Sequence, residues 1–125
     1  MSTKKSSLLD KKRKTVLKGK RFDEYLKENY DAFFEKSFRL NSAQLFGLSL
    51  NTVKTLKLSI KSFDTLKGQI IAVDRFRNIV IMQILNQNKQ QSKVKMFGYS
   101  SVFGKTALKK TTTNLLTLLS EKNKN

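Results

Sequence analysis

One stretch in the middle of the chain, residues 56–85, constrains the fold more than any other part. Its first third alternates strictly between polar and apolar residues, with Leu56, Leu58 and Ile60 as the apolar set. This period of two is typical of a strand that buries one face. Two further apolar runs follow after short polar breaks, and such tight connections predict a strongly bent antiparallel sheet. The stretch therefore predicts three consecutive strands, at residues 56–61, 69–73 and 79–85.

Weaker patterns extend the sheet toward the C-terminus. Residues 94–97 predict a fourth strand, Gly98 interrupts it, and residues 100–103 predict a short fifth strand. The polar segment 86–93 is typical of an exposed loop. We therefore expect a mainly β fold, a five-stranded, strongly bent antiparallel sheet, preceded by an N-terminal α-helix.

Residues 22–38 supply that predicted helix. Apolar side chains recur there at helical spacing, at Phe22, Leu26, Tyr30, Phe33 and Phe34. We expect the aromatic stripe to pack on the sheet or on a partner, because such stripes more often fill a core than bind a ligand. Residues 40–53 are ambiguous: Ser42 could cap a short helical turn that Gly47 ends.

The two ends of the chain are predicted to lie outside the domain, which spans residues 22–104. Residues 1–21 hold nine Lys or Arg and one acid, so we expect a disordered basic tail. Residues 105–125 form a C-terminal tail whose leucines are spaced for a short amphipathic helix, either docked on the domain or a partner, or mobile. The first tail contains a run that resembles a nuclear localisation signal, or else adds nonspecific RNA affinity: Lys11, Lys12, Arg13 and Lys14.

Composition narrows the function classes. The formal net charge is +17, from 26 Lys and Arg against 9 Asp and Glu, which favours a polyanionic partner, RNA first and an anionic membrane face second. No apolar run approaches the roughly 20 residues of a membrane span. The chain has no Cys and no His, which excludes the usual zinc sites, disulfides and imidazole bases. We expect no enzyme activity, no metal or cofactor, no small-molecule substrate and no membrane partner.

The central stretch also contains four residues at the spacing of a known motif: Gly68, Asp74, Phe76 and Asn78. A second, partial motif match lies at residues 96–103, around Gly98. With these motifs, residues 55–103 resemble the Sm/LSm family. The resemblance implies an Sm-like small barrel that contacts RNA through the loop after its second strand.

Carried over by position, the resemblance implies that Phe76 stacks on a base, Asn78 hydrogen-bonds the base edge and Asp74 orients Asn78. The residues themselves agree, because an exposed aromatic between Arg75 and Arg77 offers a stacking platform flanked by phosphate-pairing cations. The predicted RNA site comprises Arg75, Phe76, Arg77, Asn78 and Gly98, with Asp74 and Gly68 as structural support.

A purely structural reading of the same loop also stands. In that reading Phe76 packs inward, Asp74 caps the turn and Asn78 takes a left-handed conformation. Two departures from the family pattern point to a divergent member: Phe97 stands where the family has an arginine, and Phe63 where it often has a glycine.

Three functional interpretations follow. The first is a non-catalytic Sm-like subunit of a ribonucleoprotein in RNA processing, such as a splicing snRNP, that binds small nuclear or messenger RNA. It would join other Sm-like subunits by pairing its fourth strand with a neighbour's fifth. The second is a scaffold of the Gemin type, acting through protein contacts in snRNP assembly within the SMN complex. The third is a basic RNA-binding barrel of the OB or ribosomal-protein type. We expect the protein in the nucleus, the cytoplasm or both.

Overall fold

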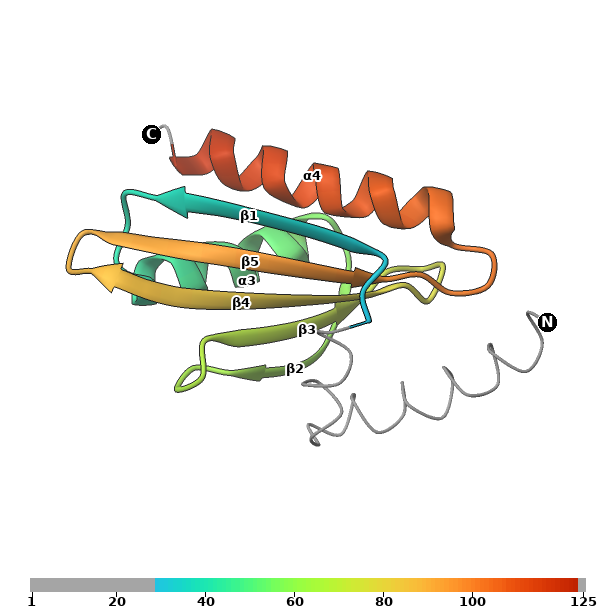
Figure 1. Cartoon of the computed structure of the whole chain (residues 1–125), viewed down its shortest axis with the longest axis horizontal. Coiled ribbons are helices and arrows are strands. Elements are labelled where there is room, and N and C mark those ends of the chain that lie inside the picture. The colour runs from blue at the N-terminus through green and yellow to red at the C-terminus, as the bar shows by residue number, and fades with distance from the viewer. Residues whose placement is uncertain (1–28, 124–125) are drawn as a thin grey trace.

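The computed structural model describes residues 29–123 (Figure 1). In chain order the elements are β1 (Ala32–Phe38), α3 (Ser42–Thr55), β2 (Ser59–Asp64), β3 (Gln69–Val73), β4 (Ile79–Asn88), β5 (Gln91–Tyr99) and α4 (Lys105–Asn123). Within this range the strands form one five-stranded antiparallel sheet in the order β1-β5-β4-β3-β2. The expected mainly β fold with a five-stranded antiparallel sheet is confirmed. The basic segment 1–21, with its candidate localisation signal, lies outside the described residues.

The central meander forms because its apolar residues alternate between two faces. Ile70, paired with Met82, faces the helices, whereas Ile71, paired with Ile81, faces the opposite side, and all four side chains are buried. The hairpin of β2 and β3 has two backbone irregularities. Strand β2 has a register shift between Ile60 and Ser62. Gly68 lies in the turn directly before β3 and has a positive φ of +66°, which glycine adopts readily.

The predicted helix over residues 22–38 is wrong where the structure describes it. Residues 32–38 form strand β1, which pairs along the outer side of β5. Phe34 faces the helix side of the sheet with Met96, whereas Phe33 and Phe97 share the other face. The spacing of four between Tyr30, Phe34 and Phe38 fits one face of a helix and also one face of a strand, whereas the adjacent Phe33 adds to the helical pattern alone. The choice between helix and strand is decided by the edge of β5, with which residues 32–38 pair. The local sequence does not reveal this distant partner. The rest of the predicted helix, residues 22–28, lies outside the described range.

An ion pair joins β1 to β5. The Nζ of Lys93 lies 2.8 Å from the Oε2 of Glu35. This hydrogen bond holds the pKa of the exposed Glu35 carboxyl below its ordinary value of 4.5. A lowered pKa means that the contribution of Glu35 to stability is present above that ordinary value. It is lost as the pH falls through the lowered one.

Two further expectations at the C-terminal end of the sheet are corrected. Segment 86–93 is not a long loop, because β4 and β5 continue into a tight hairpin with a register shift between Asn86 and Asn88. Residues 100–103 are not a strand. Side chains accept hydrogen bonds from their backbone in place of a neighbouring strand: the N–H of Ser100 donates to Asp31, and the N–H of Ser101 donates to Asn78. The fifth strand of the sheet is β1.

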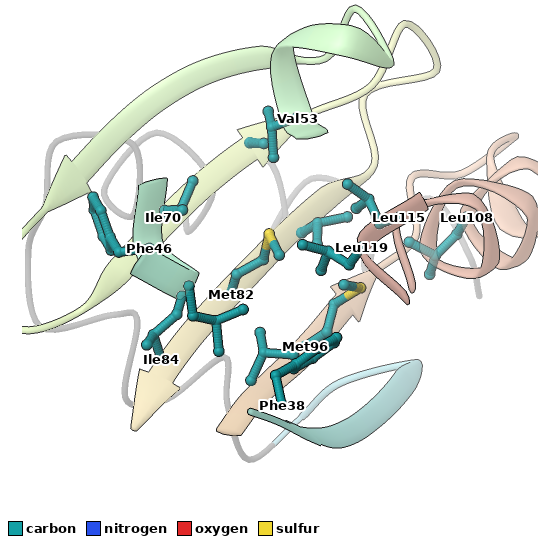
Figure 2. Close-up of a cluster of buried hydrophobic side chains, with 14 residues drawn as sticks. Phe38, Phe46, Val53, Ile70, Met82, Ile84, Met96, Leu108, Leu115 and Leu119 are labelled. Carbon is teal, nitrogen blue, oxygen red and sulfur yellow. The ribbon is translucent and has the colours of Figure 1, made fainter. Parts of the chain in front are cut away.

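Both helices pack on the same face of the sheet. Helix α3 begins at a capping box, in which Asn41 accepts from the N–H of Gln44 and the Gln44 side chain accepts from the N–H of Asn41. The helix runs through Gly47, which does not end it. Figure 1 shows α3 behind the sheet and α4 alongside β1. In Figure 2 leucines of α4 meet Met82 and Met96 of the sheet.

Residues 105–123 are therefore part of the domain, and of the outcomes left open for this segment the structure shows a docked helix. Its core side chains are Leu108, Leu115 and Leu119.

Candidate functional site

The loop between β3 and β4 is shaped by one carboxylate. The Oδ1 of Asp74 accepts hydrogen bonds from the backbone N–H of Phe76 (2.8 Å) and of Asn78 (3.0 Å). Backbone bonds close the loop, from the N–H of Arg77 to the carbonyl of Asp74 and from the N–H of Asp74 to the carbonyl of Asn78. The loop therefore has a fixed shape, and it presents its three central residues, Arg75, Phe76 and Arg77, to solvent.

Arg77 has an unfavourable backbone conformation. Its φ is +67°, in the left-handed region that favours glycine and costs other residues about 1–2 kcal/mol. The side chain at this position is exposed and makes no contribution to the core. Glycine would adopt this conformation at lower cost, so the backbone at Arg77 is strained, as it is at Lys57 (φ +60°).

Asn78 joins this loop to a second one, residues 100–104. Its Nδ2 donates to the Oδ2 of Asp74 and to the carbonyl of Gly104, both at 2.8 Å, and its Oδ1 accepts from the N–H of Ser101 at 2.8 Å. The side chain of Asn78 is completely buried. We call Asp74, Asn78, Ser101 and Gly104 the clasp.

Two further hydrogen bonds tighten the clasp. The Oγ of Ser101 donates to the carbonyl of Phe76 at 2.5 Å, and Thr111 of α4 donates to the Oδ2 of Asp74 at 3.0 Å. A Cβ atom at position 104 would overlap the side chains of Asn78 and Ser101, so only glycine fits there. The two loops and the first turns of α4 therefore form one rigid unit.

The outer surface of this unit is aromatic and cationic. Phe76 is 46% exposed and Phe103 is 95% exposed, although both belong to the loops that the clasp holds. The guanidinium of Arg75 lies 5.1 Å from the centre of the Phe76 ring and covers one face of it. We call the exposed residues Arg75, Phe76, Arg77, Val102 and Phe103 the loop tip.

The residues predicted from the sequence divide between these two layers. Arg75, Phe76 and Arg77 lie at the exposed loop tip, and Asp74 makes the expected contact with Asn78. Asn78 itself faces inward, with both amide hydrogens and its oxygen already bonded inside the chain. Contact with a base edge would require these bonds to open.

The two predicted glycines lie away from the loop tip. Gly98 is a buried residue of β5, and a Cβ there would lie 2.8 Å from the Cδ1 of Leu108 on α4. Gly68 belongs to the β2–β3 turn at the other end of β3. Phe97, at the arginine position of the family pattern, packs against Tyr30 and Phe33 with ring centres 5.6 and 5.1 Å away.

Sequence reasoning missed Ser101, Phe103 and Gly104. The alternation of residues 100–103 predicts a strand that ends before Gly104. The sequence does not reveal that the side chain of Asn78 bonds this segment in place of a neighbouring strand. The available signal was Phe103 itself, an aromatic directly before a glycine in a polar, glycine-containing segment.

The charge around the loop tip is mainly positive. Arg75, Arg77 and Lys105 are exposed there. Asp74 is buried in the clasp, and Asp31 bonds the N–H and Oγ of Ser100 through its Oδ2. No group of three or more potential metal ligands occurs in residues 29–123. The loop tip is therefore suited to hold an anion that carries flat rings.

Comparison with protein-family models and with curated proteins found no match to this chain. Among the helices that the structure describes, none is long and apolar enough to cross a membrane.

Proposed function

We propose that this chain is a non-catalytic RNA-binding subunit of a ribonucleoprotein in RNA processing, with an Sm-like small barrel, and that it holds unpaired bases at the loop tip. The observation that carries the proposal is the pair of exposed aromatics, Phe76 and Phe103, on two loops that the buried clasp fixes together. Such aromatics contribute nothing to the core, and the arginines beside them suit phosphate.

The Sm-like part of the proposal is supported by chain order and position. Helix α3 directly precedes a bent four-strand meander, β2 to β5, and the loop with the family spacing joins its second and third strands. The side chains of Asp74 and Asn78 are bonded to each other within that loop.

One observation favours the scaffold of the Gemin type as a second candidate. Strand β5 is the predicted fourth strand, and its outer side is already paired with β1 along seven residue pairs. The segment expected to pair with a neighbour as a fifth strand is a loop. Pairing with another Sm-like subunit in the expected way would require β1 to leave β5. Assembly through side-chain surfaces avoids that cost.

The RNA proposal is tested with the full-length chain and a short, unstructured, uridine-rich RNA labelled for fluorescence anisotropy. We expect Phe76→Ala and Phe103→Ala each to weaken binding by about 5- to 150-fold, which corresponds to the 1–3 kcal/mol of one stacked base. Phe63→Ala is the matched control, because Phe63 is also an exposed aromatic but lies on β2.

All variants are compared at one salt concentration, since the lysines make binding salt-dependent in every case. A duplex of the same sequence should bind all variants equally. Equal affinity of all three variants for the single strand would contradict the proposal. Recovery of the same protein partners with and without RNase treatment would then favour the scaffold.

A further inference from the structure

A second exposed surface lies at the opposite end of the sheet from the loop tip. It surrounds the turn between β2 and β3, and we call its apolar residues the hairpin patch: Phe46, Phe63, Leu66, Ile84 and Leu85. Leu66 is 97% exposed, and Phe63 and Leu85 are exposed as well. The ring of Phe63 rests on that of Phe46, with centres 6.3 Å apart.

The hairpin patch contains a pocket of about 360 Å³ between the first turns of α3, residues 65–68 and the outer part of β4. Its apolar lining comes from Ala43 and Phe46 on the helix and from Leu66, Ile84 and Leu85 on the sheet side. Polar residues complete the lining: Ser42, Thr65, Lys67 and Asn86. Its size suits one or two aliphatic side chains rather than a large cofactor.

Hydrogen bonds hold the turn that carries Leu66 in place. The Oδ1 of Asp64 accepts from the N–H of Leu66 (2.9 Å) and of Lys67 (3.1 Å), and the side chain of Gln83 donates to the carbonyl of Lys67 at 2.6 Å. The N–H of Ile84 donates to the carbonyl of Gly68 at 2.7 Å. The side chain of Leu66 is therefore exposed to solvent on a turn of fixed shape. Because it buries almost no apolar surface, it adds almost nothing to the stability of the chain.

The charges around the pocket are mainly positive. Lys67 lines it and Lys61 is exposed on the neighbouring edge strand. The first turn of α3, which forms one wall, contains no acidic residue. Asp64 is the nearby acid, and its Oδ1 already accepts two backbone hydrogens. An occupant with carboxylates beside its apolar side chain matches both features of the site.

We propose that the hairpin patch is a docking site for an acidic peptide segment of a protein partner, which inserts an aliphatic side chain into the pocket beside Leu66. A second copy of this chain is a poor occupant, because both copies carry +17 and repel each other. RNA is disfavoured in the pocket because its exposed apolar side chains, Leu66 and Leu85, are aliphatic, and the exposed ring of Phe63 lies outside the pocket lining.

The position of the hairpin patch makes it independent of the loop tip. The two surfaces flank opposite ends of β3, the patch before Gln69 and the loop tip after Val73. One chain can therefore hold RNA at one end and an acidic peptide at the other. The docking proposal does not rest on the RNA proposal.

The test uses the full-length chain as bait for a random peptide library displayed on phage. We expect recovered peptides to combine acidic residues with leucine, isoleucine or methionine. One of them, made synthetically with a fluorescent label, should bind Leu66→Gln at least about tenfold more weakly than the natural sequence. Tyr30→Gln is the matched control, because it removes an exposed, largely apolar side chain that belongs to neither the hairpin patch nor the loop tip.

Lys67→Gln should weaken the same peptide and reduce the salt dependence of its binding. Peptides without an aliphatic anchor, equal binding by Leu66→Gln, or no enrichment would overturn the proposal. Displacement of the peptide by short single-stranded RNA would show that nucleic acid occupies the patch. Formation of a dimer that Leu66→Gln abolishes would show that a second copy of the chain occupies the patch. Displacement by RNA or such a dimer would each overturn the proposal.

Discussion

Asn78 and Phe76 stand two positions apart in one loop and face opposite surroundings. Phe76 is half exposed and takes part in the clasp only through its backbone, whereas Asn78 is fully buried and bonds three other residues through its side chain. The resemblance to the Sm/LSm family assigned both of them to RNA. The structure indicates a division of labour, in which one residue holds the loops together and the other meets the ligand.

This division predicts different effects of the two alanine substitutions. Asn78→Ala leaves the partly buried N–H of Ser101 and the buried carbonyl of Gly104 without their partner. We expect it to lower the free energy of unfolding by at least about 2 kcal/mol in urea denaturation. Phe76→Ala should lower it by less than about 1 kcal/mol while reducing RNA affinity. An Asn78→Ala protein of natural stability that has lost RNA binding would instead support base reading by Asn78.

The resemblance to the Sm/LSm family implied the contact between Asp74 and Asn78, and the structure shows this contact within one short loop. The other half of the clasp could not be predicted. Gly104 lies 26 residues beyond Asn78, and only the packing of β4 against β5 brings it near. Exposure of Phe103 follows from that same packing, so no local pattern reveals it.

At the level of elements, the enclosed apolar run was predicted well, whereas the strictly alternating stretch was placed too early. A strand was predicted over residues 56–61, but helix α3 extends to Thr55 and β2 is Ser59–Asp64. Strand β3 has the predicted bounds, 69–73, because its apolar run is enclosed by a glycine turn and a polar loop. Strand β1 was mistaken for a helix because its pairing partner, β5, lies about 60 residues later in the chain. Helix α4 was underestimated because its many threonines lower its helix propensity, and burial of its leucines on the sheet compensates.

Two glycines test how the helices are held. Gly47 is exposed within α3 with nothing within 4 Å of a Cβ, so Gly47→Ala should raise the free energy of unfolding by about 0.5–1 kcal/mol. Gly98 lies in β5 where Leu108 of α4 packs against the strand. Gly98→Ala should lower the free energy of unfolding by about 1–3 kcal/mol, because Leu108 is buried and has little room to move.

Urea denaturation of both variants measures these changes. A Gly98→Ala cost that shrinks in a Leu108→Ala background would locate the strain at this contact. An unchanged cost would show that α4 does not press on Gly98.

For the whole molecule, net charge and strand pairing together decide how the chain meets copies of itself. The large positive charge was available from the sequence, and it favours polyanionic partners over self-association. The sequence did not reveal which strands form the sheet edges, because one edge is β1, which was predicted as a helix. In the structure β1 lies beside α4, where Lys36 bonds Ser120 at 2.6 Å. The other edge, β2, is short and irregular at Lys61.

We therefore predict that the purified chain is a monomer in RNA-free solution, measured by sedimentation velocity over a wide concentration range. The register shift and the exposed Lys61 discourage strand addition at β2, and the charge opposes the approach of a second copy. Lys61→Val removes the lysine at that edge and should raise self-association, whereas Lys110→Val, on the exposed side of α4, should not. A ring of identical subunits without RNA would mean that β1 releases β5. In that case Lys93→Glu, which replaces the ion pair with Glu35 by a repulsion between two carboxylates, should favour the ring by weakening the β1–β5 pair.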